Sequence, residues 1–161
     1  MRLNVKKLQI SLGKPSREIF RDVSFTLGDG SAALVTGPSG SGKTALGMAT
    51  AGLLPQWSGD YEINGSIEID GVPLTQGNPL NGTALVLENP YTQLSGLKTT
   101  VAEELAFPLE CTGVSRGEIS TAIDTYAVML GIGHLLDRRV RTLSGGELQR
   151  LLIAASLITS P

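Results

Sequence analysis

The sequence predicts an α/β fold, and three observations lead to this prediction. The first 36 residues alternate apolar and polar side chains as β-strands do, and a glycine-rich loop then joins an apolar run to a helix. From about residue 100 the pattern becomes helical. This order predicts a mostly parallel sheet around the loop, an antiparallel β edge and a helical subdomain.

The composition supports a folded chain and excludes some classes of function. Of the 161 residues, 41% are hydrophobic and 17% are charged, which is enough apolar material for a core. The formal net charge of −2 argues against a nucleic-acid partner bound by charge alone. The single cysteine, Cys111, excludes an internal disulfide, and no apolar run reaches the roughly 20 residues of a spanning helix. We therefore expect a protein that works inside the cell.

The first half of the chain is expected to hold most of the strands. Strands are predicted around Leu3–Ile10 and Phe20–Leu27, and the short run Ala32–Thr36 has the character of a buried strand. A helix over 43–54 follows, apolar on nearly all sides and therefore expected to be buried. Two more strands are expected at 66–69, before an Asp-Gly turn, and at 83–87.

The second half is expected to be helical, which divides the chain into residues 1–98 and residues 99–161. Thr100 with Glu103 and Ser144 with Glu147 have the spacing of capping boxes, in which each side chain bonds the other residue's backbone N–H. Three helices are predicted, at residues 101–109, 118–130 and 148–157.

The strongest motif is a glycine-rich loop between a predicted strand and a predicted helix. It reads Gly37-Pro38-Ser39-Gly40-Ser41-Gly42-Lys43-Thr44 and fits the pattern G-x-x-x-x-G-K-[ST]. Its glycines let backbone N–H groups converge on an anion, at the positive end of the helix that follows. We expect Lys43 to pair with nucleotide phosphates and Thr44 to bind Mg²⁺. The alternative, a turn that matches by chance, arises about once in 80 chains of this composition.

A second glycine motif lies about 100 residues later. Ser144, Gly145 and Gly146 open the last predicted helix, and the two glycines leave its first N–H groups unshielded. From the residues alone, an ordinary capped helix and a second anion site are equally good interpretations.

This second motif resembles the signature motif of ABC-type ATPases, and the resemblance runs from residue 1 to the C-terminus. In that family, two nucleotide-binding domains pair head to tail with each ATP between them. The resemblance implies that Ser144, Gly145 and Gly146 contact the ATP of a partner domain. It also implies a dimer or fused pair, bound to transmembrane subunits at the inner face of the membrane.

Two further segments are similar to the ATPases of energy-coupling-factor importers, which take up vitamins or transition-metal ions. These segments are Leu87–Leu94 and Thr100–Phe107. The resemblance implies an importer subunit that binds and hydrolyses ATP and passes the motion to membrane partners through the segment around Glu88–Leu109. The chain itself encodes no transported substrate.

Two positions depart from the family pattern. Glu88 stands where the family carries a glutamine that orients water and touches Mg²⁺, so Glu88 is a candidate for a catalytic and metal-binding role with added negative charge. Leu12 stands where an aromatic ring stacks on adenine, so Leu12 offers apolar contact without stacking. Both departures favour, as an alternative, a nucleotide-binding regulatory module that does not hydrolyse ATP.

A third departure concerns the end of the chain. Family members continue with the Walker B strand, which ends in a metal-binding aspartate and a catalytic glutamate, and then a switch histidine. We therefore expect the N-terminal part of a longer ATPase, truncated before the Walker B strand and unable by itself to hydrolyse ATP. A DNA-repair ABC ATPase is a further alternative, and the acidic balance argues against it.

Overall fold

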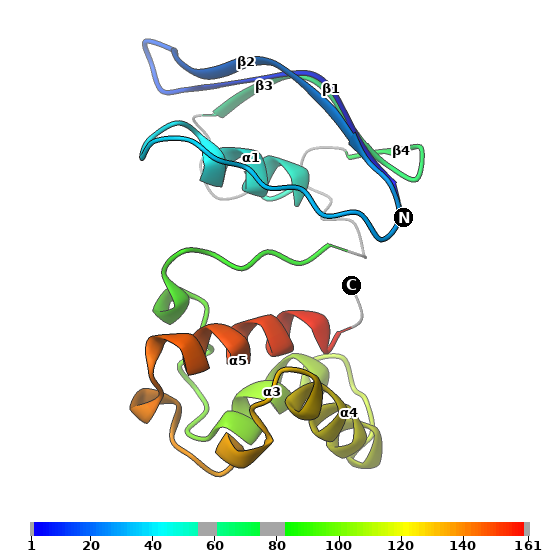
Figure 1. Ribbon diagram of the computed structural model, residues 1–161, viewed down its shortest axis with the longest axis vertical. Helices are drawn as coiled ribbons and strands as arrows, with labels where there is room; N and C mark the ends of the chain where they lie inside the picture. The colour runs from blue at the N-terminus through cyan, green and yellow to red at the C-terminus, as the bar shows by residue number, and fades with distance from the viewer. Residues whose placement is uncertain (1, 55–60, 75–82, 160–161) are drawn as a thin grey trace. The chain divides into compact units, whose positions relative to one another are not determined.

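The computed structural model describes residues 2–54, 61–74 and 83–159. The chain divides into two compact units, Met1–Thr83 and Ala84–Pro161, and each is described by itself (Figure 1). The first unit holds all the strands, and the second holds three of the four named α-helices of the described residues.

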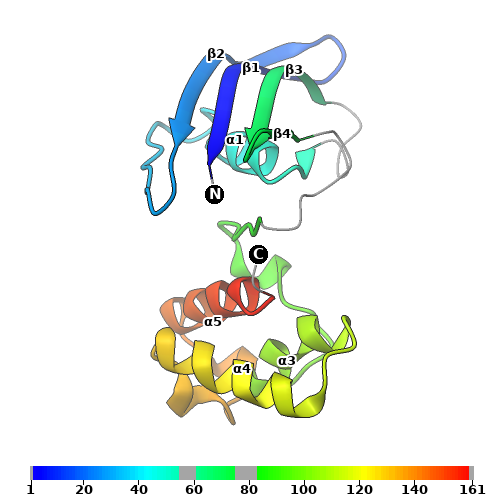
Figure 2. The same cartoon turned by 90° about the vertical axis from the view of Figure 1, so that its right-hand side faces the viewer.

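The first unit is built on an antiparallel sheet with the strand order β2-β1-β3-β4 (Figure 2). Its strands are β1 (Leu3–Leu12), β2 (Arg17–Leu27), β3 (Tyr61–Ile69) and β4 (Val72–Pro73). The two strands predicted at the start of the chain are confirmed, and they pair antiparallel, as expected for the β edge. In β1 the buried positions change from Val5 to Leu8 and Ile10, because Lys7 adopts a positive φ of 48° and the register shifts there.

Helix α1 (Lys43–Thr50) lies against one face of this sheet (Figure 1). The helix is shorter than predicted because Gly52, at φ 74°, turns the chain, and the Leu53 N–H then bonds to the Met48 carbonyl. Only Ala45 and Ala49 are buried within α1, so the expectation of a fully buried helix was wrong. Ala49 packs with Val5, Leu8, Ile10, Leu54 and Ile67 in the core of this unit.

Two of the predicted strands do not form. Residues 32–36 and 83–87 have no strand pairing, so the only sheet in the described residues is the antiparallel one, and the expected parallel sheet is not observed. Leu34 is 88% exposed and Val35 is 51% exposed. A buried strand needs a neighbour for its backbone groups, and no described strand lies beside either segment.

The second unit packs α3 (Val101–Glu110), α4 (Arg116–Met129) and α5 (Gly145–Leu157). Each begins with a capping box, of which the one at Ser115 and Glu118 was not predicted and starts α4 two residues early. Three short 3₁₀ turns connect the helices, η1 (Pro90–Thr92), η2 (Gly133–Leu135) and η3 (Val140–Thr142). The largest fully buried side chains of its core are Leu105, Ile132, Leu135, Leu148, Leu151 and Val101.

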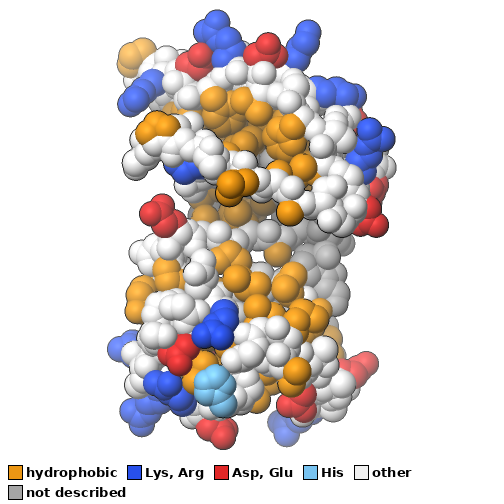
Figure 3. Space-filling view, viewed as in Figure 1, with side chains coloured by type: hydrophobic (Ala, Val, Ile, Leu, Met, Phe, Trp, Pro, Cys, Tyr) orange, Lys and Arg blue, Asp and Glu red, His pale blue; other side chains and the backbone are white. Residues whose placement is uncertain are grey.

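Both units carry apolar side chains on the face seen in Figure 3, between patches of charged and polar ones. The large apolar side chains that the structure exposes most are those of Leu34, Val128 and Leu97. Among the described residues, no helix has the length and apolar character needed to cross a membrane.

Candidate functional site

The glycine-rich loop closes around the lysine side chain. The Lys43 ammonium donates to the carbonyl oxygens of Gly37 and Pro38, at 2.8 Å each. The Ser41 N–H donates to the Pro38 carbonyl at 3.2 Å, which makes the turn of the loop. Ser39, Gly40 and Ser41 are exposed on this turn. Two hydrogen bonds therefore hold the Lys43 ammonium against the backbone of the loop.

Gly42 fixes the loop to the start of α1. Its φ is 90°, and a Cβ atom there would lie 2.6 Å from Cγ2 of Ile19 and 2.9 Å from Cδ1 of Phe20. No other residue type fits this close approach unless the Ile19 and Phe20 side chains move. At Gly37 an added Cβ would lie 2.8 Å from Oγ of Ser41, a contact that rotation of the Ser41 side chain can relieve.

The N-terminus of α1 suits an anion. Gly42 provides no side-chain cap, and the first turn carries no acidic residue. The first N–H groups of a helix have no intrahelical acceptor, and the helix dipole adds positive potential there. Together with the Lys43 ammonium, these donors fit the phosphates of a nucleotide, which was the prediction from the motif.

Thr44 and Leu12 belong to the same unit as the loop. Thr44 is exposed on the first turn of α1. Leu12 ends β1, is 37% exposed, and pairs with Tyr61 on β3 and with Arg17 on β2. The Leu12 side chain is therefore accessible to a ligand while its backbone is held between two strands.

The second motif begins α5 in the other unit. The Glu147 carboxylate accepts from the Ser144 N–H at 2.7 Å and from the Ser144 hydroxyl at 2.8 Å. Gly145 and Gly146 are exposed, with nothing within 4 Å of an added Cβ atom on either. The predicted capping box is confirmed, and the two glycines leave an open backbone surface beside it.

The hydrogen bonds from Ser144 lower the pKa of Glu147, and the charge of Arg138 adds to this effect. An Arg138 Nη1 atom lies 3.4 Å from Oε1 of Glu147. Glu147 therefore stays ionised at the start of α5, where the helix dipole also favours a negative charge. The start of α5 thus carries its own anion, whereas the start of α1 carries none.

Glu88 is exposed on a bend just before η1. Asn89 caps η1 by accepting from the Tyr91 N–H at 3.1 Å. The predicted site residues thus form two groups. Leu12 and the phosphate loop are in the first unit, while Glu88 and the motif at residues 144–146 are in the second.

Two residues with a role in this region were not predicted. The Gln93 side chain accepts from the Leu87 N–H at 2.6 Å and donates to the Leu85 carbonyl at 2.8 Å, so it holds the backbone before Glu88. Glu104 is only 5% exposed and accepts from the Ser95 N–H and hydroxyl. Two features of the sequence could have pointed to them. The Gln93 amide can both donate and accept a hydrogen bond, and Glu104 lies on the apolar side of a predicted helix.

Comparisons of the sequence with a family profile and with curated proteins point to the same family. The sequence profile of the family described as ABC transporter matches residues 20–161. The molybdate/tungstate import ATP-binding protein WtpC of Thermococcus kodakarensis is 36% identical over 151 residues, covering 93% of this chain and 43% of the relative. The maltose/maltodextrin import ATP-binding protein MalK of Yersinia pestis is 36% identical over 145 residues, covering 89% of this chain and 37% of the relative.

A solved structure has the same fold. CbiO1 from Clostridium perfringens, described as part of the ABC transporter complex CbiONQ, aligns with a TM-score of 0.83 and 22% identity. The alignment covers 99% of this chain and 62% of CbiO1. The α/β fold expected from the sequence is therefore confirmed as the fold of an ABC ATPase domain. The chain spans less than half the length of the two curated relatives.

Proposed function

The chain belongs to the ABC transporter family, and we propose that it is the ATP-binding part of an importer's ATPase subunit, which couples ATP binding and hydrolysis to the uptake of a small molecule. The observation that carries this proposal is the phosphate loop. Three features converge there: a cation at 2.8 Å from two loop carbonyls, an uncapped helix N-terminus and a glycine that admits no side chain.

Each part of the proposed ATP site has a definite task. Lys43 leaves the carbonyls of Gly37 and Pro38 to pair with the phosphates, and the N–H groups at the start of α1 donate to the same oxygens. The Thr44 hydroxyl and the Glu88 carboxylate are the proposed ligands of Mg²⁺, a cation that prefers oxygen donors and neutralises phosphate charge. Leu12 provides apolar contact to the adenine.

We propose a second ABC ATPase domain as a partner. Ser144, Gly145 and Gly146 then contact the ATP bound to that partner. Two features of the second unit support this role, since both glycines are exposed and an added Cβ on either would meet no neighbour. The Ser144 hydroxyl and N–H are already engaged with Glu147, so the backbone N–H groups of Gly145 and Gly146 are the donors that remain.

Transmembrane transporter subunits are the other proposed partners, with the chain at the cytoplasmic face of the membrane. The relatives are named as import ATP-binding proteins, and CbiO1 is described as part of a transporter complex. We keep a vitamin or a metal ion as the proposed substrate class, on the resemblance of the segments 87–94 and 100–107. The reported relatives favour neither a regulatory module nor a DNA-repair ATPase.

The test is an isothermal titration of Mg²⁺·ATP into the chain, beside Lys43→Ala. Loss of a charged donor to phosphate is expected to weaken ATP binding by about 100-fold. Lys6→Ala is the matched control, because Lys6 is an exposed lysine on β1 whose ion pair with Glu68 spans 3.7 Å. Heat that does not depend on Lys43, or no heat from the unaltered chain, would contradict the proposal.

A further inference from the structure

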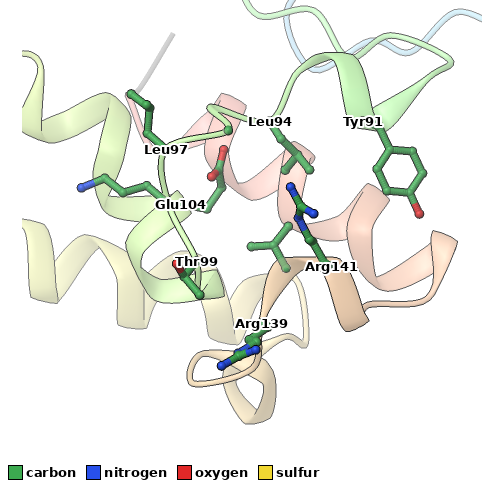
Figure 4. Close-up of a pocket in the computed structure, with 10 residues that line it drawn as sticks. Tyr91, Leu94, Leu97, Thr99, Glu104, Arg139 and Arg141 are labelled. Carbon is green, nitrogen blue, oxygen red and sulfur yellow. The ribbon is translucent and has the colours of Figure 1, made fainter.

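Two cavities of the second, helical unit share the side chain of Glu104 as part of their walls. The larger is a groove of about 600 Å³ between the loop at residues 94–99 and the turn η3 (Figure 4). The smaller, of about 190 Å³, lies between α3, α5 and the residues that follow η1, and we call it the α3–α5 pocket. All of its lining residues belong to Ala84–Pro161, so the α3–α5 pocket is complete within one unit.

Glu104 is the only charged side chain that is buried in the described part of the chain, at 5% exposed. Its carboxylate accepts from the Ser95 N–H at 2.6 Å and from the Ser95 hydroxyl at 2.8 Å, and in Figure 4 it extends from α3 toward the loop at residues 94–99. Both donors are neutral, and Lys98 is paired with Glu110 at 2.7 Å. Among the described residues no cationic side chain forms an ion pair with Glu104. Burial of a charge without a counter-ion is unfavourable, and the start of α3 offsets this cost only in part, so a cation beside Glu104 would stabilise the carboxylate.

The α3–α5 pocket has acceptors left for a cation that donates hydrogen bonds. Each carboxylate oxygen of Glu104 accepts one bond and has room for a second. The Ser156 hydroxyl, on α5, has no hydrogen-bond partner among the described residues. The Gln93 amide does not compete for Glu104, because both of its polar atoms bond to the backbone at Leu85 and Leu87. An ammonium group, with its three donors, therefore finds acceptors on both helices.

The rest of the wall of the α3–α5 pocket is apolar. Phe107 and Pro108 come from α3, and Leu152 and Ala155 come from α5. Leu152 is buried and the other three are half-buried, so the pocket can be reached from solvent. The face of an aromatic ring such as that of Phe107 also attracts a cation. An apolar cavity of about 150 Å³ holds a benzene molecule, so 190 Å³ has room for a ligand of about six non-hydrogen atoms.

We propose that the α3–α5 pocket binds a small primary amine in its protonated form. The ammonium group lies against the Glu104 carboxylate and the Ser156 hydroxyl. The alkyl chain lies against the side chains of Phe107, Leu152 and Ala155. The charge of Glu104 selects an amine over an alcohol or a carboxylate of the same length. This pocket shares no residue with the proposed ATP site, so either site can fail its test without the other.

The test is a titration of the nitrogen-15-labelled chain with pentylamine, followed through the NMR signals of the backbone amides. Pentylamine has about the size that the pocket admits and is protonated at neutral pH. We expect a dissociation constant of about 1 mM, with the largest shifts at the amides of Ser95, Phe107 and Ser156. Pentanol and pentanoate carry the same hydrocarbon chain without the positive charge, and each should bind about tenfold more weakly.

Two variants test the charge and the volume of the pocket separately. Glu104→Gln keeps the shape of the side chain and removes its charge, so pentylamine should bind about tenfold more weakly. Ala155→Leu fills the pocket and leaves Glu104 intact, so binding should be lost. Asp124→Asn is the matched control, because it removes an exposed carboxylate of α4 outside the pocket and should not change the affinity. Thermal unfolding checks that each variant folds, and Ala155→Leu still decides the matter if Glu104→Gln does not fold.

Four outcomes would overturn the proposal. They are equal affinities for pentanol and pentylamine, full affinity in Glu104→Gln, full affinity in Ala155→Leu, and no amide shifts at concentrations well above about 1 mM. A further probe, N-acetyl-lysine methylamide, carries the same ammonium group on a peptide backbone. If this probe binds more tightly than pentylamine, the free amine is replaced as the ligand by a lysine side chain of another protein, and the proposal is overturned.

Discussion

Helices α1 and α5 both begin with glycine-rich segments, but their N-termini differ in side-chain capping and in charge. The first turn of α1 has no acidic residue and no side-chain cap, and the Lys43 ammonium stands in the loop before it. The start of α5 is capped by Ser144, and Glu147 places a carboxylate 2.7 Å from the Ser144 N–H. A helix with its own anion is stable without a ligand, whereas a helix without one keeps its donors for a ligand.

The largest expected effect is on the start of α1. Gly42→Ala places a Cβ atom 2.6 Å from Ile19 and forces a positive φ on a residue with a side chain. We expect a loss of about 2–4 kcal/mol in stability, measured by thermal unfolding, and loss of ATP binding in a titration. Gly40→Ala is the control, because its φ is also positive but an added Cβ meets nothing within 4 Å. Equal losses from the two variants would argue against the close approach to β2.

The second effect concerns the cap of α5. Ser144→Ala removes the side chain that accepts from the Glu147 N–H and donates to its carboxylate. The helix should lose about 1 kcal/mol, seen as faster hydrogen exchange at the amides of α5. ATP binding at the phosphate loop should not change. Ser120→Ala, an exposed position within α4, is the control and should leave exchange in α5 unaltered.

Acid should weaken the helices of the second unit and leave helix α1 of the first unit less affected. Hydrogen bonds lower the pKa values of Glu103, Glu118 and Glu147 below the ordinary 4.5. A lowered folded-state pKa stabilises the fold above the unfolded pKa, and this stabilisation is lost as the pH falls through the folded value. Hydrogen exchange compared with the intrinsic rate at pH 7 and at pH 3 should therefore show weaker protection of α3, α4 and α5 in acid.

The matched variant for this experiment replaces all three glutamates with glutamine. It should lose less protection between the two pH values than the unaltered chain does, because no carboxylate remains at the three caps. Helix α1, whose first turn has no acidic residue, should not follow the same change. A fall in protection of equal size in the triple variant would show that the caps do not cause it.

The smallest expected effect is a gain in affinity for ATP. Leu12 is 37% exposed at the end of β1, so a tyrosine fits there without entering the core. Leu12→Tyr should tighten ATP binding by about threefold through stacking on the adenine. Leu34→Tyr is the control, since that side chain is also exposed and in the same unit. An unchanged affinity for ATP would remove Leu12 from the proposed site.

Much of the fold was predictable because its signals are local. The capping boxes at Thr100 and Ser144 depend on side chains three residues apart, and both form as predicted. The first two strands follow from alternation along the chain, and the phosphate loop follows from its glycines and the lysine. Among the site residues, those in motifs were recognisable, while Gln93 and Glu104 were not because their partners lie on other segments.

The sequence by itself determined the two glycine-rich helix starts, the helical caps and the apolar patterns that form each core. Only the tertiary structure decided that residues 32–36 and 83–87 join no strand of the described sheet, because a strand obtains its hydrogen bonds from a neighbour that its own residues do not specify. The groove between η3 and the loop at 94–99 is likewise tertiary. It exists because the bridge of Thr100 to Arg139 brings two distant segments together, and this pairing leaves Arg139 and Arg141 beside Tyr91 and Leu97.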